Sequence, residues 1–373
     1  MSKSYYIIPV FVPHEGCPHD CAFCNQHSIT GNREEISTSK IRMMIEEYLQ
    51  SINTKKDKEA VVEISFFGGT FTGIDIKKQK MLLNIAKEYK SKGKIKYIRL
   101  STRPDYINDE ILKNLKDYDV DIIELGAQSF DDEVLKAANR GHTAEDIEKA
   151  SRLIKEYGFT LGIQLMLGLP KADFHRDFYS AKKAVEVKPD FTRLYPALVI
   201  KNTEMESMYE TGEYTPYTIE ECIEITKKIF AFFEVNDIKV IRIGLQPTTE
   251  ISSGSDLVSG PFHPAIRELI EGSLINDMIS SSIIDLKEDV KLIVNQKDLS
   301  KLYCWKKKFF NKLLLNFDGN LKVETSEEIK RNEFVVQCRK KIIKLELRDY
   351  LNELVKKIMG DEFNEKKKKR ENS

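Results

Sequence analysis

The pattern of apolar residues in the first part of the chain, to about residue 250, alternates between short β-branched runs and amphipathic stretches with helical spacing. Strands buried on both faces of a parallel sheet show such continuous apolar runs, separated by helices. We predict strands over 5–13, 61–69, 96–102, 122–129, 160–170 and 191–199. We predict helices over 37–50, 75–89, 108–116, 143–158 and 174–187, several of them with Ser, Thr, Asp or Asn at the N-cap.

Six such strand–helix units predict an α/β fold, either an open parallel sheet or a partial (β/α)6 barrel of the TIM type. In both architectures ligands bind at the carboxyl ends of the strands. Residues with useful chemistry stand at those ends: Cys17 after the first strand, Gly68 and Gly69 at the second, Ser101 and Arg103 at the third and Gln128 at the fourth. A further strand over 240–246 and a helix-rich stretch complete a first domain, predicted to span 1–284.

The chain changes character after residue 284 and becomes rich in lysine. Its pattern predicts the order β-α-α-β-β-α over 285–360, with the last helix from about Ile342 to Met359. This order resembles a KH module, in which a GXXG loop between the helices clamps nucleic-acid backbone. Here the loop position reads Cys304-Trp305-Lys306-Lys307, without either glycine, so a lid or dimerisation role is an equal alternative. The tail over 361–373 is predicted to be disordered and basic.

Composition sets broad limits on what the protein does. Lys plus Arg and Asp plus Glu both number 59 among 373 residues, so net charge alone favours neither nucleic acid nor membrane. No apolar run reaches the roughly 18 residues that a membrane span needs, and the N-terminus lacks the pattern of a signal peptide. We therefore expect a cytoplasmic protein that does not enter membranes. In a reducing compartment a tight cysteine cluster indicates metal binding or catalysis.

The cluster in question is Cys17-x3-Cys21-x2-Cys24, in a loop after the first strand. Structural zinc needs four closed ligands, and the fourth would have to be a nearby histidine at an unfamiliar spacing. An iron–sulfur cluster ordinarily has four cysteine ligands, so three cysteines leave one iron open. The spacing therefore favours an iron–sulfur cluster, with zinc as the alternative.

This loop resembles the CxxxCxxC motif of the radical S-adenosylmethionine (SAM) superfamily, including the aromatic Phe23 before the third cysteine. The resemblance implies a 4Fe-4S cluster on Cys17, Cys21 and Cys24, whose open iron binds the amino and carboxylate groups of SAM. It also implies reductive cleavage of SAM to a 5′-deoxyadenosyl radical that abstracts hydrogen from the substrate. An external one-electron donor, ferredoxin or flavodoxin, is then required.

Further strand-end motifs resemble SAM-binding elements of that superfamily. The string Phe66-Phe67-Gly68-Gly69-Thr70 resembles its GGE-like element, with Thr70 in place of the Glu. The resemblance covers roughly residues 5–246. It implies that the backbone of the glycine element meets the methionine amino group of SAM, that Arg140 pairs with the methionine carboxylate, and that Gln128 is a further contact to SAM. Ser101 and Gln164 stand where the related coproporphyrinogen oxidases carry acidic groups near the ligand. The residues that the resemblance places at SAM are Phe23, Gly68, Gly69, Thr70, Ser101, Gln128, Arg140 and Gln164.

The strings "STRPD" (101–105), "ELGAQS" (124–129) and "GPFHP" (260–264) resemble the radical core of the elongator-type catalytic subunit, which modifies wobble uridine in tRNA. No string after residue 284 resembles the acetyltransferase domain of that subunit. The leading substrate hypothesis is therefore RNA, with tRNA first. The alternatives are a tetrapyrrole or another small molecule, or a metal-bearing RNA-binding protein without catalysis. His142 and His263 are possible substrate-side groups.

Overall fold

The computed structural model describes residues 5–12, 19–25, 37–52, 60–245, 256–339 and 341–371, and for 362–371 the backbone alone. The chain divides into two compact units. Unit 1 contains residues 1–217 and 245–261, and unit 2 contains 218–244 and 262–373. The predicted boundary at residue 284 follows the order of elements along the chain and stays a prediction.

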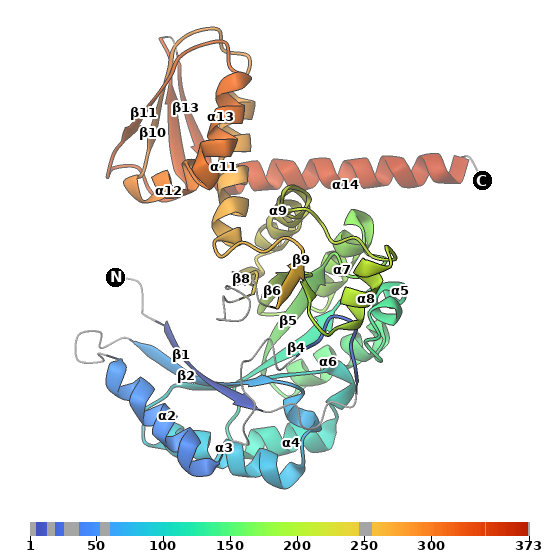
Figure 1. Cartoon of the computed structure of the whole chain (residues 1–373). Helices are drawn as coiled ribbons and strands as arrows, with labels where there is room; N and C mark the ends of the chain where they lie inside the picture. Colours follow the sequence, from blue (N-terminus) through green and yellow to red (C-terminus); the bar gives the residue numbers. More distant parts are fainter. Residues whose placement is uncertain are drawn as a thin grey trace. The chain divides into compact units, whose positions relative to one another are not determined.

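Unit 1 is built on a curled parallel sheet, seen in Figure 1. Its strands lie in chain order from β1 to β6, and each described pair of neighbours is parallel. The strands are β1 (Tyr5–Val12), β2 (Val61–Gly68), β3 (Tyr97–Thr102), β4 (Ile122–Gln128), β5 (Thr160–Leu167) and β6 (Phe191–Pro196). The predicted α/β fold with a partial barrel is confirmed.

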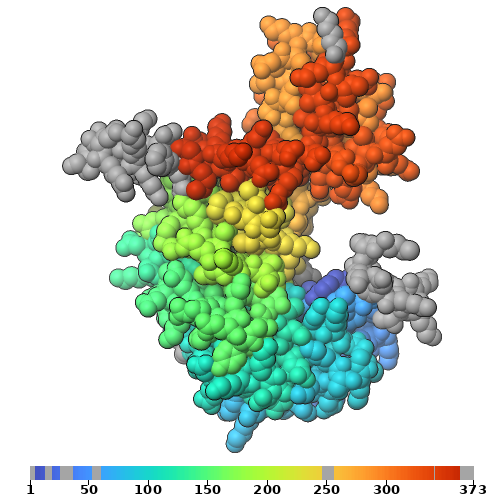
Figure 2. Space-filling view, turned by 180° about the vertical axis from the view of Figure 1, so that it is seen from behind, coloured from blue at the N-terminus to red at the C-terminus, as the bar shows by residue number. Residues whose placement is uncertain are grey.

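Helices connect consecutive strands and cover the outer face of the sheet (Figure 1). They are α2 (Thr38–Ser51), α3 (Ile76–Ser91), α4 (Asp109–Asp117), α5 (Asp132–Ala137), α6 (Ala144–Glu156) and α7 (Phe174–Glu186). Figure 2 shows this outer surface, on which segments coloured from cyan to green follow one another in chain order. The expected polar caps are present: Asn108 accepts from the backbone of α4, and Thr143 forms a capping box at α6.

The two faces of the sheet carry different residues because side chains alternate along a strand. Fully buried aliphatic residues such as Ile64, Ile98 and Ile123 lie on one side of their strands. Their neighbours in sequence, Glu63 and Glu124, are also fully buried, on the opposite side. One face therefore supplies an apolar core, and the other face carries buried charge.

A short antiparallel ribbon of β7 (Val199–Ile200) and β9 (Leu257–Ser259) follows the sheet in unit 1, together with α8 (Glu204–Glu210). None of the helices among the described residues has the length and apolarity that crossing a membrane requires.

Unit 2 combines helices with a four-stranded sheet in the order β11-β10-β12-β13. Its elements are α9 (Ile219–Val235), β8 (Lys239–Ile243), α11 (Ile266–Ile283), β10 (Val290–Val294), α12 (Leu299–Leu302), α13 (Lys308–Leu315), β11 (Leu321–Thr325), β12 (Glu333–Gln337), β13 (Ile342–Glu346) and α14 (Leu347–Glu371). The predicted small α/β domain is confirmed in class. The strand predicted over 240–246 is β8, and Gln246 lies outside the described residues.

One prediction in this region is wrong. Residues 342–346 form the strand β13 rather than the first turn of the last helix, because Ile342, Lys344 and Glu346 alternate with Ile343 and Leu345 in register with β12. The backbone over 361–371 continues α14, and the predicted disorder of the tail stays a prediction. Glu, Lys and Arg are good helix formers, and no proline interrupts this stretch.

Candidate active site

The cysteine loop is held between two distant parts of unit 1. Ala22 donates its backbone N–H to the Ala138 carbonyl after α5 at 3.0 Å, and its own carbonyl accepts from the Met205 N–H of α8 at 2.8 Å. The Ala22 side chain is buried among apolar residues, with Phe23 packed against the same cluster. Cys21 and Cys24 thus occupy fixed backbone positions, whereas Cys17 lies outside the described residues.

Two guanidinium groups approach the sulfur of Cys21. Arg140 places Nη1 3.2 Å from Cys21 Sγ and donates through Nη2 to the Gly126 carbonyl of β4 at 2.7 Å. Arg103, which follows β3, places Nη1 3.8 Å from the same sulfur. All three side chains are buried. Two buried guanidinium groups therefore lie beside one cysteine sulfur, the atom through which cysteine binds metal.

Asp105 fixes the direction of the Arg103 side chain. Its two carboxylate oxygens accept from Arg103 Nε at 3.0 Å and from Nη2 at 2.9 Å. This two-point contact leaves Nη1 as the guanidinium nitrogen directed at Cys21. His19 approaches the same carboxylate, with Nε2 3.7 Å from Asp105 Oδ2. The sequence prediction placed Arg103 at the end of the third strand, within the string "STRPD", but assigned it no contact.

The glycines at the end of β2 bring that strand close to the start of the cysteine loop. Gly68 has φ of +111°, and a Cβ there would lie 2.2 Å from the Val12 carbonyl oxygen at the end of β1. Only glycine fits this close approach. Gly69 is partly exposed beside it, and Thr70 is buried. The structure therefore places the predicted Gly68-Gly69-Thr70 element at the strand ends next to the cysteine loop.

Gln128 ends β4 in a strained conformation. Its φ of +68° lies in the left-handed region, and the pairing of β4 with β5 shifts register between Leu125 and Gln128. Such bulges and strained residues occur often at active sites. A Cβ at Gly126 would lie 2.9 Å from Gln128 Nε2 and 3.0 Å from Arg140 Nη2, so the small residue lets both side chains lie over the strand.

His142 lies beneath this group and stays neutral. Its Nε2 is 3.2 Å from the Ala127 carbonyl, so that nitrogen donates. Burial, together with the charges of Arg140 and Arg103, lowers the pKa of His142 to about 3. It is therefore a buried neutral imidazole in the physiological range of pH. His263, the other histidine considered, lies at the start of the segment before α11, where its Nδ1 accepts from the Ala265 N–H.

Ser101 and Gln164 lie deeper in the sheet. Gln164 Nε2 donates to Glu124 Oε2 at 2.7 Å and lies 3.5 Å from Ser101 Oγ. The structure thus brings these two predicted residues together, with the Gln164 amide nitrogen engaged by a carboxylate. The sequence prediction did not include Glu124.

Glu124 belongs to a layer of alternating buried charges across consecutive strands. Its Oε1 accepts from Arg99 Nη1 at 2.6 Å and from Arg193 Nη2 at 3.0 Å. Arg99 also donates to Glu63 at 3.0 Å, and Glu63 accepts from the Tyr5 hydroxyl. Two carboxylates and two guanidinium groups neutralise each other, which compensates part of the cost of removing them from water.

Several buried polar atoms beside Cys21 have no hydrogen-bond partner among the described residues. They are Gln128 Oε1, Arg140 Nε and His142 Nδ1. Buried polar atoms ordinarily have partners, so this cluster fits the binding of a polar ligand at the strand ends. No group of three or more His, Cys, Asp or Glu side chains forms a metal site within the described ranges, which do not include Cys17. The donor set present, Cys21 and Cys24 with cations nearby, fits a thiolate-bound iron–sulfur cluster.

Comparison with known families agrees with this geometry. Residues 11–178 match the model of the radical SAM superfamily, and residues 189–276 match that of the radical SAM C-terminal domain. Over 256 residues the chain is 31% identical to a Methanocaldococcus jannaschii protein named tRNA uridine(34) acetyltransferase. This match covers 59% of this chain and 47% of that protein. It is 28% identical over 261 residues to Elongator complex protein 3 of Bos taurus, covering 59% of this chain and 47% of that protein.

The chain therefore spans about half the length of these curated relatives. Among solved structures, the archaeal Methanocaldococcus infernus Elp3 with an N-terminal deletion (1–46) matches with a TM-score of 0.58 at 24% identity. That match covers 77% of this chain and 66% of the other, and it supports the fold. Because the two radical SAM models together match more than half of the chain, this protein belongs to the radical SAM superfamily and is an enzyme of that superfamily.

Proposed function

We propose that this radical SAM enzyme modifies RNA, with tRNA as the first candidate substrate. The proposal is supported by relatives that carry the name tRNA uridine(34) acetyltransferase and are about 30% identical over the radical SAM region. The observation that carries the catalytic part is the convergence of Arg103 and Arg140 on Cys21 at the ends of the parallel strands.

In this proposal Cys17, Cys21 and Cys24 hold a 4Fe-4S cluster, which supplies an electron for reductive cleavage of SAM to the 5′-deoxyadenosyl radical. Arg103 and Arg140 neutralise negative charge on the Cys21 sulfur. The remaining SAM-binding residues proposed here are Phe23, Gly68, Gly69, Thr70, Ser101, Gln128, Arg140 and Gln164.

The Gln128 and His142 acceptors and the Arg140 Nε donor are buried and have no partner among the described residues, and these are the atoms proposed to bind polar groups of SAM. The amide nitrogen of Gln164 already donates a hydrogen bond to Glu124, so Gln164 would have to share this nitrogen between Glu124 and SAM. We therefore propose that Gln164 orients Ser101, and that Ser101 donates to the ligand. The electron comes from an external donor, ferredoxin or flavodoxin.

The catalytic part is tested by reconstituting the full chain with iron and sulfide without oxygen, then measuring 5′-deoxyadenosine after addition of dithionite and SAM. We expect Cys21→Ala to abolish both the cluster absorbance and 5′-deoxyadenosine. Cys338→Ala is the matched control, because Cys338 lies in unit 2 between β12 and β13. A wild-type protein with an intact cluster and no 5′-deoxyadenosine contradicts the catalytic proposal.

The substrate part is tested by retardation of tRNA at increasing salt and by mass spectrometry of nucleosides from a deletion strain. Contacts to phosphates make binding fall steeply with salt. Active enzyme that neither binds tRNA at low salt nor changes any nucleoside contradicts the RNA substrate. That result favours the alternative, a tetrapyrrole or another small molecule.

A further inference from the structure

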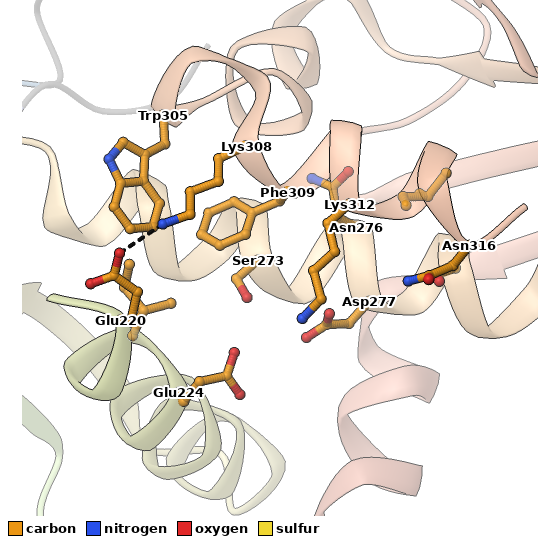
Figure 3. Close-up of a pocket in the computed structure, with 13 residues that line it drawn as sticks. Glu220, Glu224, Ser273, Asn276, Asp277, Trp305, Lys308, Phe309, Lys312 and Asn316 are labelled. Carbon is orange, nitrogen blue, oxygen red and sulfur yellow. Dashed lines mark hydrogen bonds and ion pairs between the residues drawn. The ribbon is translucent and has the colours of Figure 1, made fainter. Parts of the chain in front are cut away.

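Unit 2 contains a cavity of about 260 Å³ between α9, α11 and the segment that leads into α13 (Figure 3). Trp305 and Phe309 form one wall, with ring centroids 5.5 Å apart and planes inclined at 55°. Polar side chains from α9 and α11 form the opposite wall. All residues that line it belong to unit 2.

The turn that carries Trp305 is strained. Trp305, Lys306 and Lys307 have φ of +50°, +51° and +65°, so three consecutive residues with side chains adopt the left-handed region. This region is rare for residues other than glycine and disfavours runs of such residues. A strained backbone of this kind persists only where the surrounding structure holds it in place, and it often occurs at binding sites. Here the turn places the indole of Trp305 at the edge of the cavity (Figure 3).

The opposite wall presents fixed hydrogen-bond acceptors. The buried ammonium of Lys227 lies 2.7 Å from Glu224 Oε1 and 2.6 Å from Asp277 Oδ2. One cation shared between two carboxylates holds both side chains in place and leaves further carboxylate oxygens for another donor. The wall can therefore accept hydrogen bonds from amino and imino groups of a planar ligand.

Lysines surround the aromatic side of the cavity. Lys308 Nζ lies 4.0 Å from the centroid of the Trp305 ring and 2.7 Å from Glu220 Oε1. The side chains of Lys308 and Glu220 are both about half exposed, and ion pairs exposed in this way contribute little. Lys308 can therefore exchange Glu220 for a phosphate. Lys312 lines the cavity one turn further along α13.

We propose that this cavity binds one base of a single-stranded RNA segment. The base stacks on the indole of Trp305 and contacts Phe309 with its edge, its amino groups face Glu224 and Asp277, and the adjoining phosphates contact Lys308 and Lys312. Aromatic platforms flanked by cations are the usual means of binding single-stranded nucleic acid. This inference rests on the proposed RNA substrate and adds a site for it outside the radical SAM core.

Trp305 is the only tryptophan of the chain, so its fluorescence reports on this site alone. The full-length protein is titrated with a single-stranded oligoribonucleotide of about ten nucleotides, a length within the usual range of such sites. We expect saturable quenching that weakens as salt rises. Nucleoside monophosphates are titrated in parallel, and we expect them to bind at least tenfold more weakly than the oligonucleotide.

Binding of the labelled oligonucleotide is then compared among variants that circular dichroism shows to be folded. Trp305→Leu removes the stacking surface and should weaken binding about tenfold. Lys312→Gln should weaken binding and reduce the salt slope by about 1. Lys322→Gln is the matched control for loss of a lysine charge, because Lys322 is highly exposed on β11 and outside the cavity, and it should bind as the wild type does.

Three results overturn the inference. The first is RNA binding that leaves Trp305 fluorescence unchanged and has the same affinity in the wild type and in the Trp305 and Lys312 variants. That result keeps RNA as the substrate but shows that this cavity does not bind it. The second is equal affinity for monophosphates and the oligonucleotide. The third is absence of oligonucleotide binding in a preparation that forms 5′-deoxyadenosine, which separates failure of this site from failure of the radical chemistry.

Discussion

Replacement of Arg103 by Gln should lower the reduction potential of the iron–sulfur cluster. Gln retains a polar group of related shape but lacks the positive charge. In the structure the Arg103 guanidinium is buried and its Nη1 lies 3.8 Å from Cys21 Sγ. In the proposed site, reduction adds an electron to a cluster bound through that sulfur, and a nearby cation stabilises the added negative charge. Loss of the cation therefore makes reduction harder.

The size of the effect follows from the distance. Two unit charges 3.8 Å apart interact by about 4 kcal/mol at an effective dielectric constant of about 20. This is an upper limit, because the added electron spreads over the whole cluster and Arg140 still contacts the same sulfur at 3.2 Å. If a quarter to a half of this interaction energy acts on the added electron, the effect is about 1–2 kcal/mol. For a one-electron couple, about 1.4 kcal/mol corresponds to about 59 mV. We expect a shift of roughly 50–100 mV to more negative potential.

The assay is a redox titration of the reconstituted full chain, followed by electron paramagnetic resonance, with iron and sulfide content measured on the same samples. Arg152→Gln is the matched control, because Arg152 is exposed on α6 and its loss changes the net charge equally. Asp105→Asn removes a negative charge that partly neutralises Arg103, so by the same reasoning it should shift the potential in the opposite direction, to less negative values. An intact cluster with unchanged potential in Arg103→Gln would refute this reasoning.

Three further predictions concern stability, each measured as the urea midpoint of unfolding. Burial raises the pKa of Asp177 to about 8, so the folded chain keeps a proton that the unfolded chain loses above about pH 4. The free energy of unfolding should therefore fall as pH rises from about 4 to about 8, by up to about 1.4 kcal/mol per pH unit. Asp177→Asn should flatten this dependence, and an equal slope in the wild type and the variant contradicts the prediction. Lys306→Gly should stabilise unit 2 by up to about 1 kcal/mol by relieving a residue at φ of +51°, whereas destabilisation would show that the turn is not strained. Glu124→Gln should destabilise the fold by about 3–5 kcal/mol, because Arg99 and Arg193 lose a buried counter-charge, and a loss below about 1 kcal/mol contradicts this.

The order of strands in unit 1 was predictable because a parallel sheet leaves a clear periodic signal. The strands β2, β3, β4 and β6 are mostly buried on both faces, and the crossover helices have an amphipathic repeat. The same reasoning placed Gly68, Ser101 and Gln128 at strand ends, where the structure has them. It failed for Ile342–Glu346, because a five-residue strand that leads directly into a helix has no turn residue to separate the two patterns.

The surroundings of Cys21 were only partly predictable. Arg140 was identified through its resemblance to a known motif, but its contact with the Cys21 sulfur depends on the turn after α5, where Asn139 donates to the Asp20 carbonyl. Arg103 stands in the string "STRPD", which indicated the family but not this contact, and only folding brings it to a residue 82 positions away. Neither spacing nor periodicity reports a contact over such a separation in sequence.

The buried charges of the sheet explain why two of the predicted SAM-binding residues lie apart from the others. Glu124 engages Arg99, Arg193 and Gln164 at once, and it is fully buried. Four strands are thereby joined through one carboxylate below the strand ends, in addition to their backbone hydrogen bonds. Ser101 is the register partner of Glu124, and Gln164 is the register partner of Arg193, so both lie within this charged layer and their positions depend on it. In the sequence the strands β2, β3, β4 and β6 each show only one Glu or Arg among apolar residues. The sequence alone therefore does not distinguish a buried layer of charges from residues that face solvent. The ion pairs between these strands become visible only when the folded sheet brings the strands together.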